Sequence, residues 1–165
     1  VPPPPEMANL ARRGPIERMS RFGLEAALPL SQLVLSGVFD RFPTLKIFFA
    51  ETRLGWVPFW LEQCDLQYFR TLEWAEEILG VQPLERLPSE YIKEHIHWSV
   101  QYERVAVELR HHIGVDHIMF ATDFPHIECE WPNSQTFLKE LYADVSDDER
   151  ERIWHGNVVD FFGLS

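Results

Sequence analysis

Three short apolar runs, each followed by a segment of helical periodicity, constrain the fold of this chain more than any other feature. The runs lie at residues 45–50, 95–100 and 115–121, with β-branched or aromatic members in each. Short apolar runs between helices are typical of parallel strands, and the first run is predicted to be a central strand buried on both faces. The order helix, strand, helix, strand, helix, strand, helix therefore predicts an α/β fold with a parallel sheet.

The helical segments between these runs have recognisable boundaries. Pro58 suits the first turn of a helix, where its missing N–H costs nothing. Ser146, with Glu149 three residues later, is a capping-box pattern. The first segment is apolar almost all round, so we expect it to be packed on more than one side. The predicted helices are 24–39, 54–66, 67–80, 105–113, 135–142 and one that begins at 146, with a Pro-rich connector at 82–89 and a long loop at 124–134.

The two ends of the chain differ in composition. Residues 1–23 begin with Val1 and four prolines and are predicted to be an extended segment and loop, whereas residues 24–165 form one domain. The start has no signal-peptide pattern, and no apolar run approaches the roughly 18 residues that cross a bilayer. We therefore expect a cytoplasmic protein without a membrane partner, in which Cys64 and Cys129 are free thiols.

The net charge of -11 comes from 26 acidic and 15 basic residues. A nucleic-acid-binding surface needs a cluster of lysine and arginine side chains, and the sequence contains none of sufficient size. Nucleic acid is therefore excluded as an expected partner, and a small-molecule substrate is the partner that we expect.

Polar side chains follow each predicted strand. The first strand ends at Glu51 with Arg53 beyond it, and the third ends at Asp123 with His126 beyond it. The second runs through Ser99 towards further polar residues. Ligands of parallel α/β folds gather at the carboxyl ends of strands, so the repeated placement predicts a site there.

Each of these residues has both a functional and a structural interpretation. Asp123 can bind a metal, shuttle a proton or cap the following turn. His126 can ligate a metal, donate a proton, orient a neighbour or only form a loop hydrogen bond. Glu51 can act in the site or form an ion pair with an arginine. Trp56 and Trp131 can line a substrate pocket or belong to the core.

Two histidine pairs are further candidates. His95 and His97 have the spacing that places two ligands on one face of a strand, which could chelate a metal. They lie at the start of their strand, however, which is the wrong end for a site shared with Asp123. His111 and His112 lie near a helix end, where a cation is favoured, and we interpret them as structural.

Four segments in the same order resemble the amidohydrolase-related family, a family of metal-dependent (β/α)8 barrels that includes aminocarboxymuconate semialdehyde decarboxylase and related aromatic-acid decarboxylases. The resemblance covers about residues 24–165. It is carried by residues 36–47 (SGVFDRFPTLKI), by Glu51, Gly55, Trp56, Pro58 and Asp65, by residues 120–126 (FATDFPH) with Trp131, Pro132 and Ser134, and by Ile153 with Gly156 and Asn157.

The resemblance implies that the chain is the C-terminal part of a (β/α)8 TIM barrel. Glu51 would end the sixth strand, and residues 97–101 would form the seventh. Asp123 would end the eighth, where the family's aspartate sits at the metal and handles a proton. Many members have a histidine where this chain has Glu51. The divalent metal that we expect in the complete barrel is zinc.

The family's other metal ligands are an H-x-H pair on the first strand and a histidine on the fifth, yet residues 1–23 contain no histidine. A catalytic zinc takes three protein ligands, so Asp123 alone cannot hold it, and no metal is expected in this chain alone.

These features leave three functional hypotheses open. The first is a metal-dependent hydrolase that acts on a small carboxylated substrate. In it Asp123, His126 and Glu51 carry the chemistry, and Trp56, Trp131 and Arg53 bind the substrate. The second is a non-hydrolytic carboxy-lyase on the same scaffold. The third is a non-catalytic fragment that associates through its open sheet edges, for example as a homo-oligomer.

Overall fold

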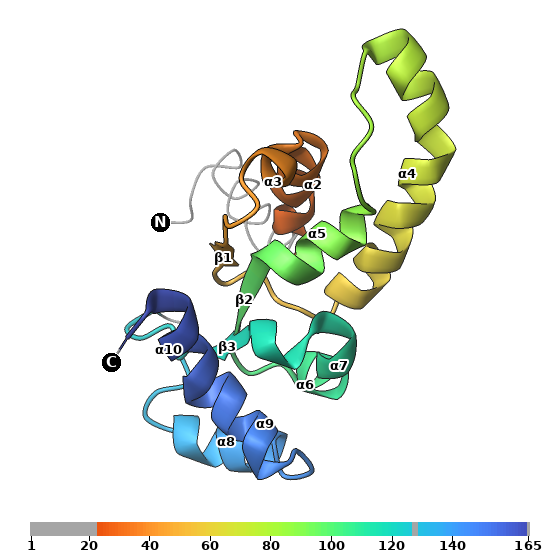
Figure 1. Ribbon diagram of the computed structural model, residues 1–165. Coiled ribbons are helices and arrows are strands. Elements are labelled where there is room, and N and C mark those ends of the chain that lie inside the picture. Colours follow the sequence, from red (N-terminus) through yellow and green to blue (C-terminus); the bar gives the residue numbers. More distant parts are fainter. Residues whose placement is uncertain (1–22, 127–128, 165) are drawn as a thin grey trace, which may run out of the picture.

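The computed structural model describes residues 23–126 and 129–164, so the extended segment predicted for the N-terminus lies outside the described residues. A parallel three-stranded sheet forms the centre of the fold (Figure 1). The strands are β1 (Ile47–Phe49), β2 (Ile96–Val100) and β3 (Ile118–Phe120). The helical elements are η1 (Leu24–Ala26), α2 (Ala27–Leu35), α3 (Val38–Arg41), α4 (Val57–Leu79), α5 (Pro88–His95), α6 (Arg104–Glu108), α7 (Arg110–Ile113), η2 (Val115–His117), α8 (Ser134–Leu141), α9 (Asp147–Glu151), the π-helical turn η3 (Arg152–Gly156) and α10 (Asn157–Phe162).

The strand order is β1-β2-β3, so β2 is the central strand. All residues of β2 are buried, whereas those of β1 are half-buried. The prediction that the first strand is central and buried on both faces is therefore wrong. Apolar composition alone does not reveal that β1 lies at an edge, because strand order is set by how the helices connect the strands. The parallel sheet itself is confirmed.

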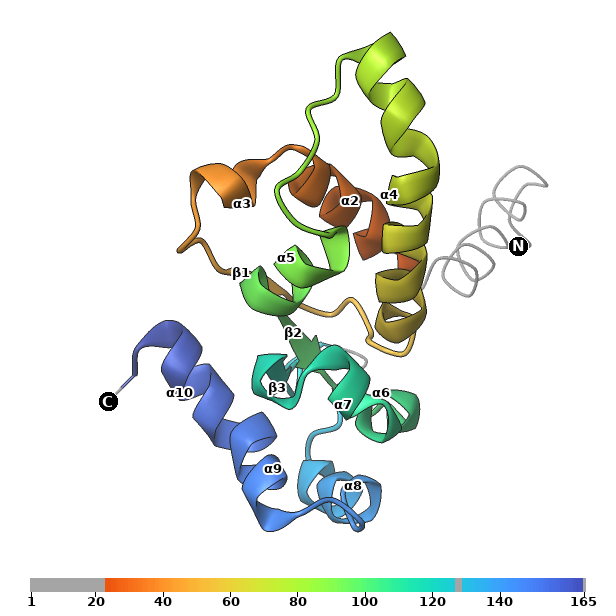
Figure 2. The ribbon, with the colours of Figure 1, turned by 45° about the vertical axis from the view of Figure 1, so that its right-hand side comes forward.

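The two faces of the sheet have different neighbours. On one face, Trp98 of β2 packs edge-on against Trp56, which precedes α4. On the other face, the ring of His97 lies 4.8 Å from that of Phe161 in α10. Helices α2 to α5 gather on one side of the sheet in Figure 2, and α8 to α10 lie on the opposite side.

The first predicted helix is divided into shorter elements. Gly37 adopts a left-handed conformation with φ 65°, which a residue with a side chain rarely takes, and it separates α2 from α3. In α2, Leu30 and Val34 are buried, but Leu28 is 67% exposed. The expectation that this segment is packed on more than one side is therefore wrong for the described chain, since one side of α2 faces outwards.

Other boundaries are set by contacts distant in sequence. Helix α5 replaces part of the predicted connector, because the Asp65 carboxylate of α4 accepts hydrogen bonds from the backbone N–H and the hydroxyl of Ser89 at 2.9 and 2.6 Å. The two predicted segments 54–66 and 67–80 form the single helix α4, which has Pro58 in its first turn and ends at Gly80. None of the described helices is long and apolar enough to cross a membrane.

The last predicted capping pattern is partly confirmed. The Ser146 hydroxyl accepts a hydrogen bond from the backbone N–H of Glu149 and starts α9.

Asn157, the first residue of α10, is buried and donates from Nδ2 to the carbonyls of Val115 and Ile118, each at 2.7 Å. This side chain fastens the C-terminal helix to the start of β3.

Candidate functional site

Strand β1 ends in a turn that positions Glu51. The residue has φ 58°, and its backbone N–H donates to the Ser99 hydroxyl beyond the middle of β2 at 2.8 Å. The Glu51 side chain is 53% exposed and can therefore move. The bond to Ser99 fixes the backbone, while the carboxylate stays free to reach towards a ligand.

Strand β3 ends in a second turn that positions Asp123 and His126. The His126 backbone N–H donates to the Asp123 carbonyl at 2.8 Å, and its Nδ1 lies 2.9 Å from Asp123 Oδ1. The same Nδ1 lies 3.9 Å from Glu51 Oε2. The Asp123 side chain is 12% exposed and His126 is 65% exposed. Residues from the two outer strands thus meet at one edge of the sheet.

The backbone around this cluster adopts unfavourable angles. Among the residues that the structure describes, the non-glycine residues with positive φ are Glu51, Arg53 and Asp123, with values between 54° and 58°. Such conformations cost of order 1 kcal/mol or more each and are found preferentially at functional sites. Their location after the two outer strands, at the same edge of the sheet, therefore agrees with a functional role for this edge.

A cavity of about 600 Å³ opens beyond β1 and β2. The Glu103 carboxylate accepts hydrogen bonds at 2.6 to 3.0 Å from the backbone N–H groups of Leu54 and Gly55. A Cβ on Gly55 would lie 3.1 Å from that carboxylate, so a larger residue here would force the carboxylate to shift by a few tenths of an ångström. The residues that line the cavity are Leu24, Arg53, Gly55, Trp56, Tyr102, Glu103 and Glu130.

Glu130 is the lining residue that sequence reasoning missed. Its Oε1 accepts a hydrogen bond from the backbone N–H of Tyr102 at 2.9 Å, whereas its Oε2 is buried without a hydrogen-bond partner. The residue lies within the predicted 124–134 loop, where one glutamate among other polar residues carries no distinguishing pattern. Its position between the FATDFPH segment and Trp131 is the one signal that could have suggested it.

The predicted substrate-binding residues lie in different places. Arg53 and Trp56 line the cavity, although the Trp56 indole N–H donates to the Thr52 carbonyl and its ring packs on the core. Trp131 is 64% exposed and its ring lies 5.3 Å from that of Phe124. The structure therefore brings Arg53 and Trp56 together but does not place Trp131 in the cavity lining.

The histidine pair at the start of β2 is not a chelating pair in this structure. His95 is the last residue of α5, its Nδ1 lies 2.7 Å from the Leu45 carbonyl and its ring stacks on Phe39. His97 is buried, stacks on His117 at 4.5 Å, and neither of its ring nitrogens has a hydrogen-bond partner. Burial, with smaller effects from His117 and Lys46, lowers the pKa of His97 to about 4.

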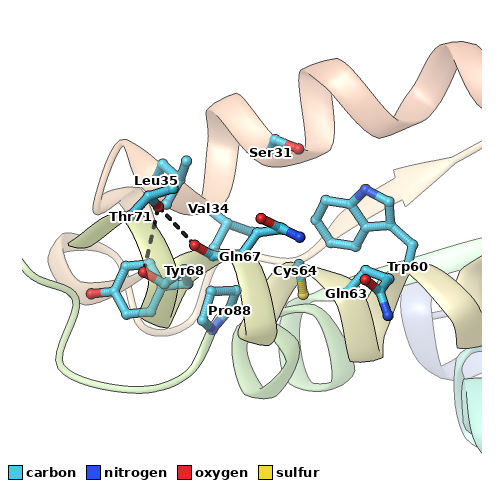
Figure 3. A pocket seen from close by; sticks show the side chains of 10 residues that line it. All are labelled: Ser31, Val34, Leu35, Trp60, Gln63, Cys64, Gln67, Tyr68, Thr71 and Pro88. Atoms are coloured by element: carbon cyan, nitrogen blue, oxygen red, sulfur yellow. Dashed lines mark hydrogen bonds between the residues drawn. The ribbon is translucent and has the colours of Figure 1, made fainter. Parts of the chain in front are cut away.

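A separate apolar groove runs between α2 and α4, with a volume of about 270 Å³ (Figure 3). Cys64 lies in it and is a free thiol, as predicted for both cysteines. Burial raises the pKa of this thiol to about 12, and the neighbouring Asp65 adds to the effect. The raised pKa keeps the thiol protonated at neutral pH, and the described lining of the groove contains no carboxylate or imidazole.

The strand-end cluster has a donor set that suits a divalent metal. Glu51, Asp123 and His126 each offer one ligand atom, and these atoms lie within 4.8 Å of one another. Within the described ranges this is the one such group of three. Two carboxylates and an imidazole match the preferences of manganese and zinc, so these residues fit the metal that the family resemblance implies.

The comparisons with known proteins agree with the sequence resemblance. The amidohydrolase family profile matches residues 22–164. The gamma-resorcylate decarboxylase of Polaromonas sp. strain JS666 is 24% identical over 147 residues, which are 87% of this chain and 42% of the relative. The chain thus spans about two fifths of the length of this curated relative.

Solved structures resemble this chain over a similar share of their length. The 5-carboxyvanillate decarboxylase of Sphingomonas paucimobilis superposes with a TM-score of 0.70 at 25% identity, over 87% of this chain and 41% of that protein. The enzyme of the same name from Novosphingobium aromaticivorans gives 0.72 at 21% identity, over 87% and 40%, and its structure holds manganese and 4-hydroxy-3-methoxy-5-nitrobenzoic acid. The profile match and the shared α/β fold lead to one conclusion: this chain belongs to the amidohydrolase family.

Proposed function

We propose that this chain is the C-terminal part, about strands six to eight, of a barrel enzyme that removes CO2 from a small aromatic carboxylate with the help of a divalent metal. The observation that carries the proposal is the meeting of Glu51, Asp123 and His126 at the carboxyl edge of the sheet. The relatives favour the carboxy-lyase over the hydrolase, because those named above are decarboxylases of aromatic acids.

The metal would be held by the Asp123 and Glu51 carboxylates of the cluster. When bound, it supplies positive charge that orients a carboxylate or phenolate oxygen and stabilises negative charge on it. Manganese is the metal named with a relative. We therefore propose manganese in place of zinc.

The remaining steps depend on the chain's own side chains. Decarboxylation requires a proton at the ring carbon that carries the carboxylate. The bond between that carbon and the carboxylate then breaks, its electron pair returns to the ring, and CO2 leaves. Asp123 is the shielded member of the cluster and has the His126 imidazole at 2.9 Å, so this pair is placed to hold and deliver the proton.

The cavity beyond β1 and β2 would hold the rest of the substrate. Arg53 offers a guanidinium that can bind a carboxylate, and Trp56 offers part of an aromatic wall. Trp131 is proposed as an outer contact for a ring that enters over the loop, because its side chain is exposed beside Phe124.

The test is an assay of the chain, in the longest polypeptide that its gene encodes, with Mn2+ and either 2,6-dihydroxybenzoate or 5-carboxyvanillate in D2O. We expect release of CO2 and one deuterium at the vacated ring carbon, and loss of both in Asp123→Asn. Hydrolysis of an ester or amide without CO2 release would favour the hydrolase instead. If the metal is bound but neither reaction occurs, the proposed function is refuted.

A further inference from the structure

We infer that two copies of this chain associate through helix α4, so that α4 of each copy lies along the groove between α2 and α4 of the other. This surface lies outside the strand-end cluster and outside the cavity lined by Arg53. The association is therefore independent of the proposed decarboxylation.

Helix α4 extends far beyond the strands beside it. Its 23 residues give a length of about 35 Å, whereas the five residues of β2 span about 17 Å. Among the described side chains of α4, only those of Val57 and Leu61 near its start are buried. The second half projects past the sheet in both Figure 1 and Figure 2. Because short helices are only marginally stable without tertiary packing, we expect a packing partner for this half.

The projecting part of α4 exposes large apolar side chains. Phe69 is 64% exposed and Ile78 is 73% exposed. Leu66, Trp74 and Ile78 follow one another at intervals of eight and four residues, so they lie towards one side of the helix. The exposed large apolar residues of α4 are Phe59, Leu66, Phe69, Trp74 and Ile78. Large contiguous apolar surfaces are rare on monomers and indicate an interaction site.

The groove between α2 and α4 joins this surface. Its walls are α2 and the middle of α4, and it has a volume of about 270 Å³ (Figure 3). Leu35 of α2 lines it and is 48% exposed, and Gln67 lines it from α4. Trp74 lies seven residues, or two turns, after Gln67 and therefore continues the same side of α4 beyond the groove. The groove and the projecting side chains thus form one apolar strip.

Further βα units of a barrel would leave this strip exposed. The helices of a (β/α)8 barrel form an outer ring around the strands, so a groove between two successive helices opens outwards. Helices α2 and α4 precede and follow β1 and are two such helices. The strip is therefore available to a second copy in a longer polypeptide of this family as well.

The strip is complementary to itself. A two-fold axis brings the same surface of both copies together, so a protruding side chain must face a hollow in the same helix of its partner. Trp74 is the protruding ring, and the groove beside Gln67 is the hollow. Placing Trp74 of one copy at Gln67 of the other packs the two α4 helices antiparallel and sets the axis near Arg70.

The exposed apolar area is sufficient for a specific dimer. A buried aromatic side chain contributes about 150 to 250 Å2, so the exposed parts of Phe59, Phe69 and Trp74 amount to roughly 350 Å2 per chain. With Leu66, Ile78 and the groove walls, two copies bring on the order of 1,000 Å2, which is the lower limit for a specific interface. We therefore expect a dissociation constant on the order of micromolar.

Charge distinguishes a second copy from a basic partner on the same strip. The acidic residues of α4 outnumber its one arginine, Arg70, and the chain has a net charge of -11. Two copies therefore repel each other, and salt screens this repulsion. A basic peptide would be attracted instead, and its binding would weaken with salt. Association between two copies should accordingly become tighter as the salt concentration rises.

The experiment is sedimentation equilibrium of the longest polypeptide that the gene encodes, at low and high salt, over concentrations that bracket the micromolar range. We expect a dimer that salt tightens. Trp74→Ala should weaken it at least about tenfold, because a tryptophan that fills a groove carries much of the binding energy. Trp131→Ala is the matched control, since it removes an exposed indole outside α2 and α4, and it should leave the dissociation constant unchanged.

Disulfide formation tests the geometry of the pair. The variants are made in a chain that also carries Cys64→Ser and Cys129→Ser, so that the introduced thiol is the only one among residues 1–165. Arg70→Cys lies near the proposed axis and should link two copies on mild oxidation. Glu108→Cys is the matched control, because Glu108 is exposed on α6, and it should not link them.

Circular dichroism of each variant shows whether a lost association reflects a lost fold, and Ile78→Ser replaces Trp74→Ala if the latter does not fold. A monomer at every concentration and salt, or equal dissociation constants for Trp74→Ala and Trp131→Ala, would overturn the inference. Association that salt weakens, or a link through Glu108→Cys in place of Arg70→Cys, would overturn it too. Decarboxylation by a monomer would overturn the dimer and leave the proposed function intact.

Discussion

The two ends of the same three strands have histidines in opposite environments. At the amino end, His97 is buried, stacked on His117 and without a hydrogen-bond partner for either ring nitrogen. At the carboxyl end, His126 is 65% exposed and faces two carboxylates. The amino end has the sequence spacing of a chelating pair, but the three potential ligand atoms that lie close together are at the carboxyl end.

This difference shows that the spacing of histidines in sequence is a weaker guide than their place on the sheet. His95 and His97 alternate as ligands on one strand should, yet His95 belongs to α5 and bonds to the Leu45 carbonyl. At the carboxyl ends, by contrast, Glu51, Arg53 and Asp123 adopt left-handed backbone conformations just after the strands. We therefore expect substitutions at the amino end to change stability and substitutions at the carboxyl end to change ligand binding.

The largest expected effect concerns the pH dependence of stability at the amino end. Burial lowers the pKa of His97 to about 4, whereas the unfolded chain has an ordinary value of about 6.5. Between these values the unfolded chain takes up a proton that the folded chain does not. The free energy of unfolding should therefore fall by about 2 to 3 kcal/mol as the pH decreases from 6.5 to 4, and be retained above 6.5.

His97→Phe should reduce this fall, because phenylalanine does not titrate and packs beside Phe161. The remainder is expected from His117, whose pKa is also lowered by burial. Urea unfolding at several pH values, with the wild-type chain measured in parallel, gives the comparison. If the free energy of unfolding changes equally with pH in the two proteins between pH 4 and 6.5, His97 is not the group that folding keeps neutral.

The second effect concerns the attachment of α10. Asn157→Ala removes both side-chain hydrogen bonds to the carbonyls of Val115 and Ile118 and leaves a cavity where the buried amide lay. We expect a loss of about 2 kcal/mol in the free energy of unfolding, measured by urea denaturation. Asn133→Ala is the matched control, because its side chain is exposed and makes no capping bond, and it should change stability by less than about 0.5 kcal/mol. Equal effects of the two substitutions would contradict the role of Asn157.

The smallest effect is expected at the carboxyl end. Trp131 is 64% exposed and contacts Phe124, so Trp131→Ala should change the free energy of unfolding by less than about 0.5 kcal/mol. If the ring is an outer contact for substrate, the same variant should raise KM and leave kcat nearly unchanged. A stability loss above 1 kcal/mol would instead identify Trp131 as part of the folded core.

The sequence predicted much of the fold because its signals are local. The parallel sheet, Pro58 at the start of α4 and the Ser146 cap are confirmed, as is the family. The edge position of β1, the division of the first helix at Gly37 and the start of α5 were not predicted correctly. Each depends on a distant contact or on a backbone angle, such as the cap that Asp65 provides to Ser89.

The candidate site was predicted in part for the same reason. Glu51, Asp123 and His126 could be named because each follows a strand, and their close approach depends on the parallel order that brings those ends to one edge. Their functional roles stay predictions. Glu130 could not be named, because its approach to the Tyr102 N–H depends on how the loop after β3 folds back over β2.

One measurement tests most directly whether the carboxyl end, rather than the amino end, is the ligand-binding edge. Crystals of the chain grown with Mn2+ would locate the ion by its anomalous scattering. We predict a single strong peak bounded by Glu51, Asp123 and His126. A peak beside His97 and His117, or none at the carboxyl edge with the ion present at saturating concentration, would contradict this assignment.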